Sequence, residues 1–179
     1  MKAPRSTFLS WLLSAAVGVG AMPSLAEDCV DFKWDVAQER ALFAGSATAV
    51  AAGAEAKTAP ALQLQHLYEL KLLPQGQVTF SATPGKKSPR EGSFAGLATF
   101  KIPGSGSYRV SIDMPFWIDV VRDGALLAAT DFQGQHGCES PHKIVVFDLL
   151  GTRPFTLQFS NAEPQSVRLT ITATPARKF

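Results

Sequence analysis

The chain has 179 residues, of which 17 are basic and 15 acidic, and two of the residues are cysteines. This length predicts one folded domain. The near balance of charge gives no basis for electrostatic attraction to nucleic acid or to anionic lipid, so we expect no nucleic-acid partner.

The first 26 residues have the pattern of a secretory signal peptide. Lys2 and Arg5 form a short basic region, and an uncharged apolar run follows over residues 8–22. The small residues Ser24 and Ala26 predict cleavage after Ala26. The apolar run is shorter than the roughly 20 residues that a spanning helix needs, so we expect no integral membrane span after cleavage. The expected location is the periplasm or the extracellular space.

Cleavage would leave 153 residues for the mature protein. The leader holds two of the 17 basic residues and none of the 15 acidic ones, so the remainder carries 15 of each sign. The chain has two cysteines, Cys29 and Cys138. Such a small, even number predicts a disulfide in an oxidising compartment. Closing so long a loop contributes about 4–5 kcal/mol in the chain-entropy account. We expect this bond to tie an N-terminal segment, residues 27–60, to a β-rich domain, residues 61–179.

The N-terminal segment shows little strand pattern. Phe32, Trp34 and Val36 share a face if the backbone is extended, and Asp35 is placed to cap a short helix over residues 36–43. Residues 44–60 are rich in Ala, Gly and Thr and predict a connector with at most one short strand.

From residue 62 onward, apolar residues recur at every second position, which is the pattern of half-buried β-strands. Asp123-Gly124 predicts a hairpin turn, and Gln158 and Thr170 are expected to face water. The predicted strands are residues 62–72, 78–80, 94–102, 108–114, 116–121, 125–132, 144–150, 155–159 and 167–171.

About nine short strands, separated by Gly, Pro and Asp turns, predict an all-β fold. We expect an antiparallel β-sandwich, either jelly-roll or immunoglobulin-like, with a short helical or irregular segment at its N-terminus. The strand pattern does not distinguish the two topologies.

The densest polar group lies in the loop around the second cysteine. His136 and His142, with Glu139 between them, have donor types that suit iron or zinc, and Asp131 lies nearby. The alternative is a disulfide-pinned surface loop, which is favoured because the spacing matches no specific metal signature. His66 is either a further ligand or base, a hydrogen-bonded core histidine, or a residue that a shifted strand register turns to solvent.

Two features suggest contact with a ligand rather than catalysis. Lys86, Lys87 and Arg90 form a basic loop that suits an anion, although charge in such a turn is usually only solvated. Phe116 and Trp117 point to opposite sides of one strand, so one of them is a candidate platform for a sugar, unless both are buried between layers. We find no nucleophile motif and no distinct acid–base pair, so no catalytic residue and no cofactor site is assigned.

Several motifs spread over the chain beyond the leader carry a resemblance to known proteins. They are Cys29-x-Asp31-Phe32-x-Trp34-Asp35-Val36, Glu39, Leu42-Phe43, Gly106-Ser107-Tyr108-Arg109-Val110, Trp117-x-Asp119-Val120 and the loop from Cys138 to His142-Lys143. With these motifs, most of the chain beyond the leader resembles a group of small exported bacterial proteins of unknown role. Some of these proteins are labelled homogentisate 1,2-dioxygenase, an iron enzyme that uses two histidines and a glutamate. More loosely, residues 97–132 resemble prepeptidase C-terminal-type jelly-roll domains, which are noncatalytic modules.

The sequence therefore favours a noncatalytic exported β-sandwich that binds a small ligand or an envelope protein. Binding would use loops at one end of the sandwich, including residues 84–91 and 133–142. The alternatives are a small metal-dependent oxygenase that uses His136 and His142 with iron or zinc, and a carbohydrate-binding module that uses Trp117 or Phe116.

Overall fold

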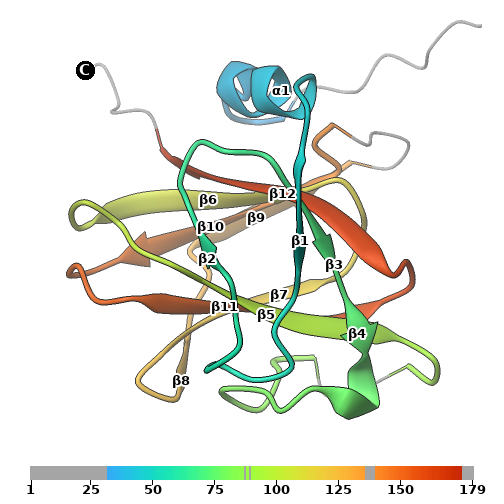
Figure 1. The fold of residues 1–179 in the computed structure, drawn as a ribbon. Helices are drawn as coiled ribbons and strands as arrows, with labels where there is room; N and C mark the ends of the chain where they lie inside the picture. Colours follow the sequence, from blue (N-terminus) through green and yellow to red (C-terminus); the bar gives the residue numbers. More distant parts are fainter. Residues whose placement is uncertain (1–31, 87, 89, 136–139, 175–179) are drawn as a thin grey trace, which may run out of the picture.

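The protein is a two-layered β-sandwich with one short helix, seen in a computed structural model that describes residues 32–86, 88, 90–135 and 140–174 (Figure 1). The predicted leader and several predicted site residues lie outside these ranges. Those site residues are Cys29, Cys138, His136, Glu139 and Lys87.

The first sheet has six strands in the order β1-β3-β12-β6-β10-β9. Neighbouring strands run antiparallel, except for the edge pair β1 and β3, which is parallel. The bounds are β1 Thr48–Ala51, β3 Tyr68–Lys71, β6 Gly106–Ile112, β9 Asp131–Gly134, β10 Lys143–Leu149 and β12 Ser166–Ala173.

The second sheet has the order β2-β5-β11-β7-β8, and a sixth strand, β4, pairs with β5. Here β2 and β5 are parallel, and the other pairs are antiparallel. The bounds are β2 Ala61–Leu62, β4 Leu73–Pro74, β5 Phe94–Phe100, β7 Trp117–Arg122, β8 Ala125–Leu127 and β11 Phe155–Ala162.

The predicted all-β sandwich is confirmed, with differences in detail. The described residues form twelve strands rather than about nine, and two edge pairs are parallel. The expected strand 62–72 is broken because Gln65 adopts a positive φ of 57°. The expected strand 125–132 is two strands, β8 and β9, in different sheets. The predicted hairpin turn is present, with Asp123 and Gly124 both at positive φ, as a type I′ turn requires.

The core lies between the two sheets. Alternating residues of each strand point inward, so Val, Leu, Ile and Phe side chains from both layers meet. Phe100 stacks on Phe155 with ring centroids 5.4 Å apart, and Phe116 meets Phe159 edge-on at 5.6 Å. These aromatic pairs join strands of the second sheet across their inward faces.

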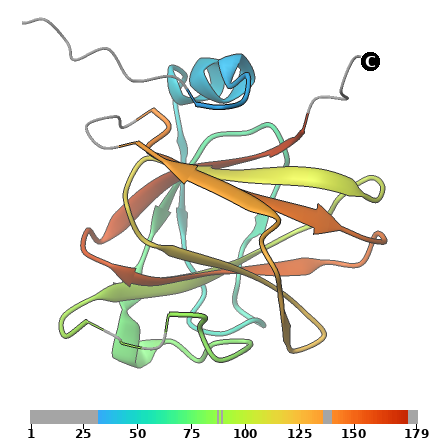
Figure 2. The same cartoon turned by 180° about the vertical axis from the view of Figure 1, so that it is seen from behind.

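The outer face of each sheet is also covered, which corrects the expectation that Gln158 and Thr170 face water. Helix α1 (Ala37–Phe43) lies over the first sheet, and the segment 75–86 passes the second sheet (Figures 1 and 2). Gln158 is 1% exposed and Thr170 is 0% exposed. Strand periodicity identifies the inward face, but it does not show which distant segment covers the outward one. No helix in the described part of the chain is long and apolar enough to cross a membrane.

A buried ion pair fastens α1 to the first sheet. An Arg109 guanidinium nitrogen lies 3.3 Å from Glu39 Oε1, and the Thr172 hydroxyl donates to the same oxygen at 2.6 Å. Arg109 also donates to the Asp35 carbonyl at 2.7 Å, and the Asp35 carboxylate accepts from the backbone N–H of Ala37 at 2.9 Å. A seven-residue helix is too short to be stable alone, so these contacts and packing hold it.

Candidate ligand-binding site

One end of the sandwich carries an open hollow of about 460 Å³, which we call the end hollow. Its walls come from four parts of the chain that the fold brings together: the loop before β5, the start of β7, the start of β10, and the end of β11. The wall residues that matter below are Lys86, Arg90, Trp117, Lys143, Asn161 and Glu163.

The indole of Trp117 forms one wall and is held in place from behind. Trp117 is 37% exposed, whereas its neighbour Phe116 is buried, as two successive residues of a strand should be. The indole N–H donates to Asp119 Oδ1 at 2.8 Å. Because that N–H is already used, Trp117 offers its ring surface to the hollow.

Asp119 also fixes the loop that passes over the second sheet. Its Oδ2 accepts from the backbone N–H of Gly85 at 3.1 Å and lies 3.4 Å from Gln158 Nε2. A Cβ on Gly85 would come within 3.0 Å of both the Trp117 indole nitrogen and Asp119 Oδ1. A glycine therefore lets the loop approach closely, which sets Lys86 beside the hollow.

Lys143 lies half-buried in the hollow, opposite the indole. Its Nζ donates to the Phe116 carbonyl at 2.9 Å and lies 5.6 Å from the centre of the Trp117 ring. Burial lowers the pKa of Lys143; the negative charge of Asp119 opposes this shift, and the positive charge of Lys86 adds to it. Within the described ranges, no carboxylate lies within ion-pair distance of the Lys143 ammonium group.

The remaining wall is a polar network at an irregularity in β11. The register of β11 against β5 shifts between Phe159 and Ala162, and Asn161 there has a positive φ of 57°. Asn161 Oδ1 accepts from the Arg90 backbone N–H at 2.9 Å. The Arg90 guanidinium group pairs with Glu163. These contacts anchor the loop before β5 to the end of β11.

The structure brings together three of the four predicted ligand-face residues: Lys86, Arg90 and Trp117 all line the end hollow. Sequence reasoning missed the other contributors, which are Lys143, Asn161 and Glu163 in the walls and Asp119 behind the indole. Asp119 shares a strand face with Trp117 two residues earlier, and that spacing is a usable signal. Lys143 has no such signal, because its position opposite Trp117 depends on the two sheets meeting at this end.

Among the other described candidates, Phe116 is buried and contributes to the lining of the end hollow, whereas His66 and Asp131 lie elsewhere. His66 is exposed, with Nε2 2.8 Å from Thr48 Oγ1. It is neither a core histidine nor part of a strand with a shifted register, because it lies between β2 and β3, next to the turn at Gln65. Asp131 pairs with Lys33 at 2.5 Å. Among the described residues, no group of three His, Cys, Asp or Glu side chains is arranged to hold a metal. Since His136 and Glu139 lie outside those residues, the metal site that they would form with His142 stays a prediction.

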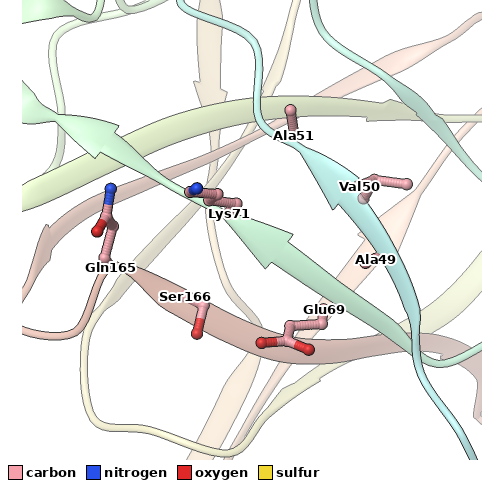
Figure 3. Close-up of a pocket in the computed structure, with 7 residues that line it drawn as sticks. All are labelled: Ala49, Val50, Ala51, Glu69, Lys71, Gln165 and Ser166. Atoms are coloured by element: carbon pink, nitrogen blue, oxygen red, sulfur yellow. The ribbon is translucent and has the colours of Figure 1, made fainter.

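A second hollow, of about 480 Å³, lies beside the edge strand β1 (Figure 3). Figure 3 shows Ala49 and Ala51 of β1 next to Glu69 and Lys71 of β3. The charged side chains here are exposed, and the neighbouring strand offers only small aliphatic ones. The end hollow is the stronger candidate because it combines an aromatic wall with a half-buried charge.

Comparison with known proteins does not assign a family. No protein-family model matches the chain, and a search of curated proteins finds no significant match. The inference about function therefore rests on the geometry of the end hollow together with the sequence patterns.

The lowered pKa of Lys143 predicts a specific pH dependence of stability. Between that lowered pKa and the ordinary lysine value of 10.5, the unfolded chain binds more protons at this residue than the folded one. The free energy of unfolding should then rise with pH across this window, and this rise should be absent from Lys143→Met. Urea unfolding of both proteins at a series of alkaline pH values measures the difference. Lys101 is exposed and directly follows β5, so Lys101→Met should show the same pH dependence of stability as the unaltered protein. Identical pH dependence in the unaltered protein, Lys143→Met and Lys101→Met would contradict the prediction.

Proposed function

We propose that this protein is a noncatalytic, exported β-sandwich module that binds a ligand in the end hollow. The observation that carries the proposal is the pairing of a half-exposed, rigidly held Trp117 indole with the half-buried ammonium group of Lys143 across one open hollow. Ligand sites typically combine apolar surface with a few fixed polar groups.

The groups around the end hollow favour binding over catalysis. The Asp119 carboxylate accepts hydrogen bonds from the Trp117 indole and from the backbone N–H of Gly85, so both of its oxygens are engaged in holding the walls of the hollow. Lys143 is held by a backbone carbonyl rather than by a nucleophile or a catalytic partner. These hydrogen bonds hold the walls of the hollow in place, which is what a preorganised binding site needs.

The proposed location rests on the sequence of the leader and on the two cysteines. A basic start, an apolar run and a small-residue cleavage site over residues 1–26 support export. Cys29 and Cys138 support an oxidising compartment, where we propose that they form a disulfide. A soluble ligand or the exposed part of an envelope component would reach the end hollow there.

The test is a binding screen in which one side chain is removed. We expect at least one member of a panel of neutral and acidic oligosaccharides to shift the NMR signals of residues around the end hollow. Trp117→Ala should weaken that binding about 30-fold, because a central tryptophan typically contributes 2 kcal/mol or more.

Leu126→Ala provides the matched control. Leu126 is 39% exposed and lies in β8, paired with Val121 at the end of β7 that is far from the hollow. This substitution should leave binding unchanged. The proposal fails if no panel member perturbs the end hollow, or if Trp117→Ala binds as well as the unaltered protein.

A further inference from the structure

The ammonium groups of Lys143 and Lys86 both belong to the end hollow and have no carboxylate partner among the described residues. They are close enough for the charge of Lys86 to disfavour the charged form of Lys143. Two like charges held near each other, one of them half-buried, are stabilised when an anion binds between them. The end hollow therefore favours a negatively charged ligand.

The charges around the hollow specify how much negative charge fits. Among the described residues, three cations lie at the hollow, namely Lys86, Arg90 and Lys143, and two carboxylates, Glu163 and Asp119, offset two of them. The net charge of these five described residues is +1. A monoanion matches this value, whereas a phosphate monoester, at about −1.5 to −2 near neutral pH, would exceed it and be repelled by Glu163.

The rest of the hollow specifies the body of the ligand. The Lys143 Nζ lies over the Trp117 ring, 5.6 Å from its centre, and the indole is 37% exposed. A ligand ring that packs on the exposed part of the indole would have its edge near the ammonium group. The rim adds Ser88 and the exposed Arg90–Glu163 pair. These groups supply both donors and acceptors for hydroxyl groups, so a hydroxylated ring fits better than a purely aromatic one.

We infer that the ligand of the end hollow is an acidic sugar of the uronate class, with its carboxylate between Lys143 and Lys86 and its ring on Trp117. This inference rests on the proposed function and names its ligand class.

The experiment compares trigalacturonate, each ring of which carries one carboxylate and so places a single negative charge in the hollow, with its methyl ester, which keeps the rings and removes the charge. By calorimetry, trigalacturonate should bind, and esterification should weaken binding about tenfold or more, as expected for losing a hydrogen-bonded charge. Lys143→Met and Lys86→Met should each lose a similar factor, because methionine keeps the apolar stem and removes the ammonium group. Lys101→Met should bind normally.

The outcomes separate this inference from the proposed function. Equal binding of acid and ester, lost in Trp117→Ala, overturns the uronate assignment and leaves a neutral-ligand module. Absence of trigalacturonate binding also overturns the assignment, and the wider panel then decides the proposed function. If trigalacturonate binds and none of the Trp117, Lys86 and Lys143 variants weakens that binding, the ligand lies elsewhere. That result would overturn both the uronate assignment and the proposed function.

Discussion

Replacing Arg109 by methionine is expected to lower the free energy of unfolding by about 3–5 kcal/mol. Arg109 and Glu39 have side chains that are only 3% and 1% exposed, and they pair beneath α1. Loss of Arg109 would leave the Glu39 carboxylate buried without its counter-charge. Its second oxygen, Oε2, already has no hydrogen-bond partner within the described residues, so the remaining contacts do not compensate.

Urea unfolding of matched variants tests this expectation. The double variant Glu39→Met with Arg109→Met should recover most of the loss, because replacing both members of a buried pair by apolar side chains is often near neutral. Arg153→Met breaks an exposed pair with Asp123 and should cost less than about 1 kcal/mol. A loss for Arg109→Met as small as that for Arg153→Met would show that the buried pair does not anchor the helix.

Phe159→Ala is the second change with a large expected effect, a loss of about 3–5 kcal/mol. Phe159 is 0% exposed and packs edge-on against Phe116 at 5.6 Å. Phe116 precedes Trp117, and its carbonyl accepts the hydrogen bond from Lys143. The cavity would therefore loosen the floor of the end hollow as well as the core.

Two measurements check this variant. Chemical unfolding gives the loss of stability, and NMR shows whether the signals of Trp117 and Lys143 move. Phe132→Ala removes a ring that is 67% exposed and should change stability by no more than about 0.5 kcal/mol. If Phe159→Ala costs no more than Phe132→Ala, the described packing is wrong.

The inward faces of some of the long strands were predictable from alternation alone. The runs that form β6, β11 and β12 repeat apolar residues at every second position, and that period matches the sheet. β10 is apolar at four successive positions, so its inward face could not be identified in this way. The short edge strands were not predictable. β2 has two residues and β4 has two, so neither is long enough to show a period.

The candidate site was predictable only in fragments. A basic loop and an aromatic strand position are visible in the sequence, and they identify Lys86, Arg90 and Trp117. Their convergence, and the place of Lys143 opposite the indole, depend on pairing between residues far apart in the chain. The same limit explains the error at Gln158: its polarity suggests solvent, but its Nε2 donates to the Ala82 carbonyl at 3.1 Å beneath a covering loop.

The position of β12 has a consequence for how the molecule is made. It is the last of the twelve strands in chain order, yet it lies between β3 and β6 in the first sheet. Until residues 166–173 have left the ribosome, that sheet is two unconnected pieces, and Val167, Leu169 and Ile171 are missing from the core. The first sheet can therefore be completed only when nearly the whole chain has been synthesised, and the export that we propose would require a chain that has not yet closed this sheet.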